Sequence, residues 1–248
     1  MSRPAPARAL FALVAMELRL AARRGESVLV SMLVPPAVLL FFATTGLVPG
    51  IGERAVDFLL PGSMALAIIA SAFVSLGIAT AYERAYGVLK RLGGAPITAL
   101  MLVVAKALAT LVVVALQVAV LIVVARALLG WSPGPDVSIG LAAVALALGI
   151  AAFAALGLLM AGTLRAEATL ALANALLLAF LMLGGIVLPV DHLPAELQAV
   201  AAALPATALA DLLRVALGGV GDPIAPAAIL LAWATAASAL AARMFRWD

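Results

Sequence analysis

The sequence contains no cysteine and a single histidine, and this scarcity excludes several kinds of site. Without thiols the chain has no disulfide framework and no thiolate nucleophile. His192 alone cannot supply the two imidazoles of a bis-histidine haem or the ligand set of a zinc site. We therefore expect no metal and no cofactor in this chain.

Catalytic motifs are also missing. Lys90 and Lys106 are the only lysines, and neither follows a glycine, so the phosphate-binding sequence G-x-x-x-x-G-K-[ST] is absent. Ser63 lies in Pro-Gly-Ser-Met rather than in G-x-S-x-G, which argues against an intramembrane serine protease. The chain is not expected to be an enzyme or to bind ATP in the P-loop manner.

Charge is scarce as well, since 11% of the 248 residues are charged and 67% are hydrophobic. A helix that crosses a bilayer needs about 20 apolar residues. Six stretches of at least 19 residues carry no charge, namely 27–52, 58–82, 107–125, 137–164, 168–190 and 223–242. They are apolar on every face, unlike the alternating strands of a membrane barrel. The sequence predicts an all-α integral membrane protein with six transmembrane helices.

The basic residues fall mainly on one side of these six spans. Twelve of the 15 Lys and Arg residues lie on the side of the N-terminus, and only Arg54, Arg126 and Arg214 lie on the other. The positive-inside rule then places both termini in the cytoplasm. The expected location of the protein is a bacterial inner (plasma) membrane. Because the basic residues flank span ends instead of forming a soluble face, nucleic acid is not an expected partner.

Three regions are predicted along the chain. Residues 1–26 form a cytoplasmic N-terminal interfacial helix, 27–242 form the six-span domain, and 243–248 form a cytoplasmic tail. Residues 191–221, before the last span, carry two apolar helical stripes separated by Pro205, which predicts a short outer helical hairpin.

One cytoplasmic loop carries most of the functional information. From Tyr82 to Ile97 the chain reads YERAYGVLKRLGGAPI. Four of its charged side chains lie on a helix end at the membrane surface, a form suited to docking into a cleft of another protein; they are Glu83, Arg84, Lys90 and Arg91. On charge alone, an anchor that follows the positive-inside rule explains them equally well.

This segment resembles the signature of the ABC-2 type transporter permeases, especially the drug-export branch. The matching residues are Glu83-Arg84, Gly87, Leu89-Lys90-Arg91-Leu92 and Pro96-Ile97, followed by Lys106 in the next span. The order of six spans, the basic N-terminal segment and the outer helices extend the resemblance over nearly the whole chain. The sequence departs from the pattern at Gly93-Gly94-Ala95, where many members carry bulkier or polar residues.

The resemblance implies the transmembrane permease subunit of an ATP-driven exporter. Such a subunit moves a hydrophobic or amphipathic substrate, such as a drug, a lipid or a lipid-linked molecule, outward by alternating access. Loop 83–96 would be the coupling helix received by a separate ABC ATP-binding subunit, which holds ATP and Mg. A second permease subunit, identical or similar, would complete the unit among membrane lipids, with the substrate path at the subunit interface.

The resemblance also gives roles to the residues of the loop. Glu83 and Arg84 would fix it against the partner or the N-terminal helix, and Gly87 would allow a close backbone approach. Lys90 and Arg91 would pair with acidic residues of the ATP-binding subunit. Lys106 would bind the coupling loop or a lipid phosphate, the alternative being a side chain that snorkels to the membrane surface.

The substrate path and the general function have alternatives. Phe73, Phe180 and Met182 are candidates for an apolar path, and the alternative is that they face lipid or neighbouring helices. A non-transporting membrane scaffold or assembly protein would share this hydropathy without needing an ATPase. A membrane-embedded lipid-processing enzyme would need paired carboxylates, for which Glu83 and Glu167 are the candidates.

Overall fold

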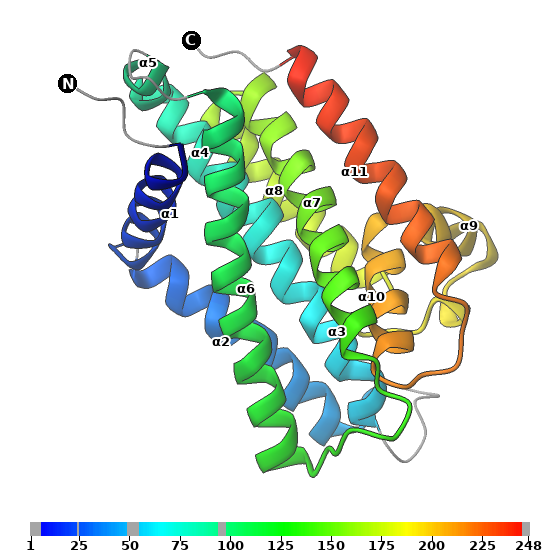
Figure 1. Ribbon diagram of the computed structural model, residues 1–248. Coiled ribbons are helices and arrows are strands. Elements are labelled where there is room, and N and C mark those ends of the chain that lie inside the picture. The colour runs from blue at the N-terminus through cyan, green and yellow to red at the C-terminus, as the bar shows by residue number, and fades with distance from the viewer. Residues whose placement is uncertain (1–5, 24, 49–54, 94–97, 245–248) are drawn as a thin grey trace.

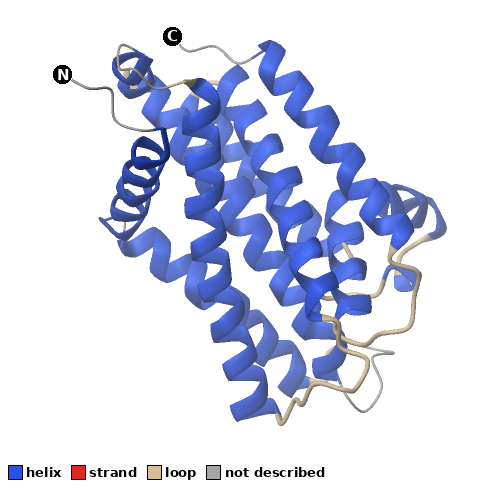
Figure 2. Cartoon of the chain, viewed as in Figure 1, coloured by secondary structure: helices blue, strands red, loops and turns tan. Residues whose placement is uncertain are grey.

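The protein is a bundle of helices in the computed structural model, which describes residues 6–23, 25–48, 55–93 and 98–244. These described residues contain no strand (Figure 2). Five helical stretches are long and apolar enough to cross a membrane. The prediction of an all-α, multi-pass membrane protein is confirmed.

One long helix runs through the middle of the bundle and supplies much of its core. It consists of α3 (Ala55–Ile68), the π-helical segment η1 (Ile69–Ser75) and α4 (Leu76–Ala85), which follow one another without a break. Nearly every side chain from Leu59 to Val74 is buried. A helix surrounded by other helices must be apolar on all sides, which explains the hydropathy of the predicted span 58–82.

Four further helices can cross a membrane: α6 (Ala99–Leu129), α7 (Ile139–Thr163), α8 (Ala166–Leu183) and α11 (Ile224–Met244). The first three pack against the central helix, and α11 packs against α7 and α10. The four helices correspond to the last four predicted spans.

The residues at the two ends of α6 explain where the helix begins and ends. The Thr98 hydroxyl accepts a hydrogen bond from the Met101 N–H at 3.2 Å, and Gly130 ends the helix with a positive φ of 66°.

The first predicted span, 27–52, corresponds to α2 (Gly25–Thr45). At about 1.5 Å per residue, its 21 residues extend over roughly 30 Å. The helix continues through Pro35 and Pro36, as the sequence predicts, and ends at Thr45. It is shorter than the charge-free stretch because Gly46 adopts a positive φ of 63° directly after it.

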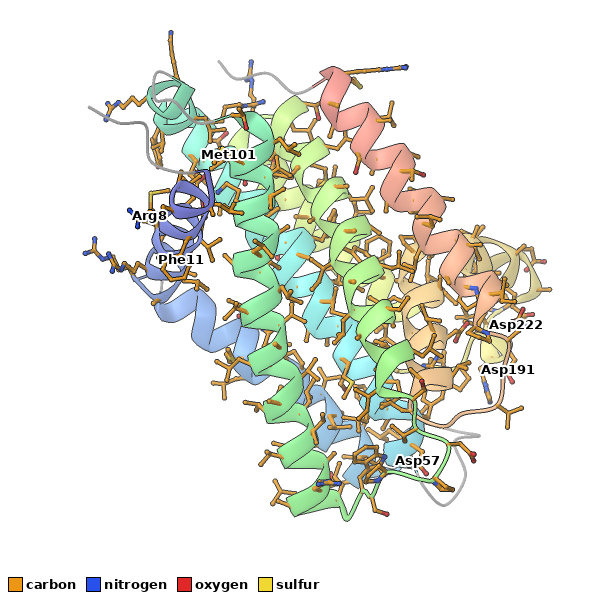
Figure 3. The ribbon with its side chains drawn as sticks, viewed as in Figure 1. Arg8, Phe11, Asp57, Met101, Asp191 and Asp222 are labelled. Atoms are coloured by element: carbon orange, nitrogen blue, oxygen red, sulfur yellow. The ribbon has the colours of Figure 1, made fainter. Side chains whose placement is uncertain are left out.

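The N-terminal helix α1 (Pro6–Arg23) precedes the predicted spans and packs against α6. Leu13 faces the bundle and is buried, whereas Phe11 is 76% exposed and points outward (Figure 3). One apolar face is therefore covered while another remains open. The exposed side also carries Arg8, Arg19 and Arg23, so α1 is amphipathic, in agreement with the predicted interfacial helix.

A bent pair of helices is present where the sequence predicts the outer hairpin, and we keep that name for residues 195–216; its location on the outer side of the membrane stays a prediction. α9 (Ala195–Ala203) and α10 (Pro205–Ala216) meet at an angle of 77°, with the bend at Leu204 before Pro205. The stripe of α10 is fully buried against α3, α7 and α11, and its members are Leu209, Leu212, Leu213 and Ala216. α10 is thus part of the bundle, while Leu197 and Val200 of α9 stay exposed.

The central helix approaches its neighbours closely at two places, and glycines lie at both. A Cβ at Gly157 of α7 would lie 2.8 Å from the Phe73 carbonyl oxygen, and Gly77 faces Gly157 in turn. At Gly62, a Cβ would overlap the Ile186 backbone. A side chain at these positions would overlap the neighbouring backbone. Such close approach allows the van der Waals packing that holds membrane helices together, because the hydrophobic effect contributes little to their association within a bilayer.

The two ends of the bundle carry different elements (Figure 1). One end, called here the α5 end, carries α5 (Val88–Gly93) and the end of α11. The loop between α6 and α7 and the start of α3 lie toward the opposite end. The predicted boundaries at 26, 242 and 243 stay predictions.

Candidate functional site

The central helix ends in a sharp turn that leads into α5. The N–H of Tyr86 donates to the Tyr82 carbonyl at 2.9 Å, and the N–H of Gly87 donates to the Arg84 carbonyl at 2.9 Å. Gly87 has a positive φ of 69°, and no described atom lies within 4 Å of the position its Cβ would take. Within this chain, the turn rather than crowding explains the glycine. Its approach to a partner stays a prediction.

Three charged side chains meet beneath this turn, and we call them the Lys106 cluster. The Lys106 Nζ lies 2.7 Å from the Glu83 Oε2 and 2.9 Å from the Glu17 Oε1. The side chains of Lys106, Glu83 and Glu17 are only 4%, 11% and 13% exposed. One ammonium group therefore holds two carboxylates in a nearly dry site, a geometry in which the loss of one partner is expensive.

The Lys106 cluster connects three separate elements. Glu17 comes from α1, Glu83 from the end of α4, and Lys106 from about two turns inside α6. The chain entering the turn is thereby tied both to the N-terminal helix and to the following span. Lys106 therefore pairs with Glu83 of the predicted loop, and its ammonium group is buried inside the protein.

Arg84 makes a second tie at the same level. Its guanidinium donates a hydrogen bond to the Leu164 carbonyl, at the C-terminal end of α7. The last carbonyls of a helix have no partner within the helix, so a guanidinium is a favourable donor there. Glu83 and Arg84 thus both point into the protein and fix the end of the central helix.

The remaining charged residues of the loop point outward. Leu89 is 1% exposed and anchors α5, whereas Lys90 and Arg91 beside it are exposed. α5 therefore presents two positive charges at one end of the bundle (Figure 1). The other predicted loop residues from Gly94 to Ile97 lie outside the described part of the chain, as does the side chain of Leu92.

The three candidates for a substrate path lie in two different surroundings. Phe73 and Phe180 are 1% and 7% exposed, and their ring centroids are 5.8 Å apart in an edge-to-face contact. Phe153 completes the group, at 6.2 Å from Phe73 and 5.7 Å from Phe180. Met182 is 53% exposed and lies outside it. The structure joins the aromatic residues as packed core and leaves Met182 on the surface.

A second cation holds the opposite part of the bundle. Arg214 of α10 donates to the Asp211 carboxylate at 2.7 Å and to the Gly185 carbonyl, and its Cζ lies 3.9 Å from the centre of the Phe58 ring. These partners tie the outer hairpin to α3 and to the turn after α8. Beside them lies an open cavity of about 450 Å³ that Pro226 and Ile229 also line.

Glu17 and Phe153 are the site residues that sequence reasoning does not single out. Glu17 interrupts an otherwise apolar segment and reads as one charge of an interfacial helix. The signal that could have found it is Lys106, because a lysine inside a spanning helix needs a buried counter-ion. Nothing in the sequence chooses Glu17 over the other acidic residues.

A comparison with protein families shows the family to which the chain belongs. The model of the ABC-2 type transporter family matches residues 8–217, a range that contains the Lys106 cluster, α5 and the outer hairpin. A comparison with curated proteins gave no match. Because the family model covers well over half of the chain, the chain belongs to the ABC-2 type transporter family and is a membrane subunit of a transporter of the ABC type.

Proposed function

We propose that this chain is the permease of an exporter driven by a separate ATP-binding subunit, and that α5 with its flanking turn is the coupling element. The family implies pairing with an ABC ATP-binding subunit. Lys90 and Arg91 supply exposed positive charge for acidic residues of that subunit. The substrate is a hydrophobic or amphipathic molecule, and transport proceeds by alternating access.

The Lys106 cluster is the observation that supports this proposal. A push on α5 reaches the membrane only if the loop is stiffly joined to the spans. Two buried ion pairs, at 2.7 and 2.9 Å, make that joint with α6 and α1. Arg84 adds a connection to the end of α7. A loop that served only as a topological anchor has no need for buried charges, which are costly in a membrane protein.

The distribution of basic residues supports a proposed orientation. Lys90 and Arg91 lie on α5, and Arg84 lies at the end of α4 beside it. This end of the bundle is therefore proposed to face the cytoplasm, where the ATP-binding subunit is found. One permease subunit forms half of the unit. A second copy or a similar permease completes it, with the substrate path between the two.

Charge reversal on α5 tests the proposal. In the double variant Lys90→Glu/Arg91→Glu, co-purification of the ATP-binding subunit from native membranes and ATP-dependent export should be lost, because both side chains would repel acidic partners. The matched control is Arg243→Glu, an exposed basic residue at the same end of the bundle. It should leave both measurements unchanged.

Two results would contradict the proposal. The first is normal export by the doubly reversed variant. The second is recovery of the wild-type chain from native membranes without any ATP-binding subunit, which would favour a scaffold or assembly protein. Labelling of a cysteine introduced at the exposed Tyr86 with a membrane-impermeant reagent tests the orientation independently, because the chain has no cysteine of its own.

A further inference from the structure

A buried glutamine joins three helices near the middle of the bundle. Gln117 of α6 is 2% exposed. Its Nε2 donates to the Ser31 carbonyl of α2 at 2.9 Å, and its Oε1 accepts a hydrogen bond from the Ser71 hydroxyl of η1 at 2.9 Å. Because a carbonyl oxygen can only accept, the amide nitrogen must face Ser31, and the amide oxygen is left for Ser71.

The bond to α2 falls where a proline removes one donor from the hydrogen bonds of that helix. In a regular helix the N–H of residue 35 would donate to the carbonyl of residue 31. Residue 35 is Pro35, which has no N–H, so this donation is missing. Gln117 supplies a donor to the Ser31 carbonyl from a neighbouring helix, as a proline inside a membrane helix requires.

The bond to η1 falls where the central helix is irregular. A π turn holds one residue more than an α turn, and such segments are rare and concentrated at functional sites. α6 contacts the central helix at two levels, through Lys106 with Glu83 and through Gln117 with Ser71. The two levels are separated by 11 residues on α6 and by 12 on the central helix. The central helix thus holds one residue more than α6 between the two levels, and a π turn accommodates one additional residue.

We propose that Gln117 is a positioning residue for transport, which fixes the π segment of the central helix to the proline-containing part of α2. Without this bond the irregular segment would absorb a displacement of α4. With it, the displacement passes to α2 and to the opposite end of the bundle. The inference rests on the proposed function, in which an ATP-binding subunit moves α5 and the end of α4.

The variants separate folding from transmission. Gln117→Leu removes both bonds and should lower the unfolding temperature. Adding Pro35→Ala returns an N–H to α2, so Gln117→Leu/Pro35→Ala should recover part of that temperature. Ser71→Ala is a milder change that removes only the bond to η1. The matched control is Asn174→Leu, since Asn174 is exposed on α8 and its Nδ2 donates within that helix, to the Leu170 carbonyl at 2.8 Å.

Two spin-label pairs would report movement in the complete complex with its ATP-binding subunit, with and without trapped nucleotide. One pair replaces Tyr86 and Met244 near the α5 end, and the other replaces Leu47 and Ile139 toward the opposite end. All four positions are exposed, by 72%, 52%, 64% and 81% respectively. The absence of native cysteine means that only the introduced thiols are labelled.

We expect nucleotide to change both distances in the wild type and in Asn174→Leu. In Gln117→Leu/Pro35→Ala and in Ser71→Ala, the change at the α5 end should remain and the change at the opposite end should be lost. A retained change at the opposite end in both variants would overturn the inference, as would its loss in Asn174→Leu. No change at the α5 end of the wild type would instead overturn the proposed function.

Discussion

Lys106 and Arg214 each tie three parts of the bundle together, and they do so by different means. Lys106 is held by charge: two carboxylates at 2.7 and 2.9 Å surround one ammonium group that is 4% exposed. Arg214 is 17% exposed, and its planar group contacts one carboxylate, one carbonyl and one aromatic ring. The first site depends on the presence of a cation, and the second depends on the shape of the guanidinium.

This difference matches the two regions in which the residues lie. The Lys106 cluster is close to the element that we propose receives the ATP-binding subunit, where a stiff joint transmits movement. Arg214 secures the outer hairpin, where several directional contacts define one position for α10. The comparison can be tested by substitutions that affect charge and shape separately.

The largest effect is expected from Lys106→Met, which keeps an unbranched side chain one heavy atom shorter and removes its charge. Glu17 and Glu83 would then stay buried without the cation they share, a loss of about 3–5 kcal/mol for a broken buried pair. The thermal unfolding temperature of the purified protein should fall strongly. Lys90→Met, at an exposed position, is the matched control. An unfolding temperature equal to the wild type would show that the cluster is not held by charge.

The next largest effect is expected from Arg214→Lys, which keeps the charge and removes the fork. A lysine cannot contact Asp211, the Gly185 carbonyl and the Phe58 ring together, so a loss of about 1–3 kcal/mol is expected. The reciprocal change Lys106→Arg keeps the charge at the other site and should cost less. The order of the two unfolding temperatures measures the contrast directly, and the reverse order would refute it.

A smaller effect is expected when one carboxylate of each site becomes an amide. Glu17→Gln leaves Lys106 with the Glu83 carboxylate and should cost about 1 kcal/mol, because a charge-assisted hydrogen bond becomes a neutral one. Asp211→Asn should cost less, since Asp211 is 50% exposed and water screens its pair. Unfolding curves of both variants and the wild type at low and high salt would check this. Salt should change the stability difference between Asp211→Asn and the wild type, and it should leave the difference between Glu17→Gln and the wild type unchanged.

The smallest effect on stability is expected from Lys90→Met. The side chain is exposed on α5 and makes no hydrogen bond or ion pair within the described residues, so the unfolding temperature should stay unchanged. The substitution should instead change the rate at which the complex hydrolyses ATP. A destabilised Lys90→Met variant would mean that α5 belongs to the folded core rather than to a docking surface.

Sequence reasoning was most successful where a property is local. Charge-free stretches predict the spans, and the helix stripe ending at Ala216 predicts the buried face of α10. It was less successful at span lengths, because capping and glycine conformation decide where a helix ends. α2 ends at Thr45 and α6 begins at Ala99, neither of which follows from the absence of charge.

The sequence by itself determined that this protein is a bundle of membrane helices with an outer hairpin and most of its positive charge on one side. Those features follow from the transfer of each segment between water and lipid, which adds up along the chain. Only the tertiary structure decided that Glu17 and Glu83 share Lys106, that Arg84 caps α7, and that Gln117 bridges Ser31 and Ser71. Each of these contacts joins residues far apart in the chain, and its stability depends on the burial and geometry that packing creates.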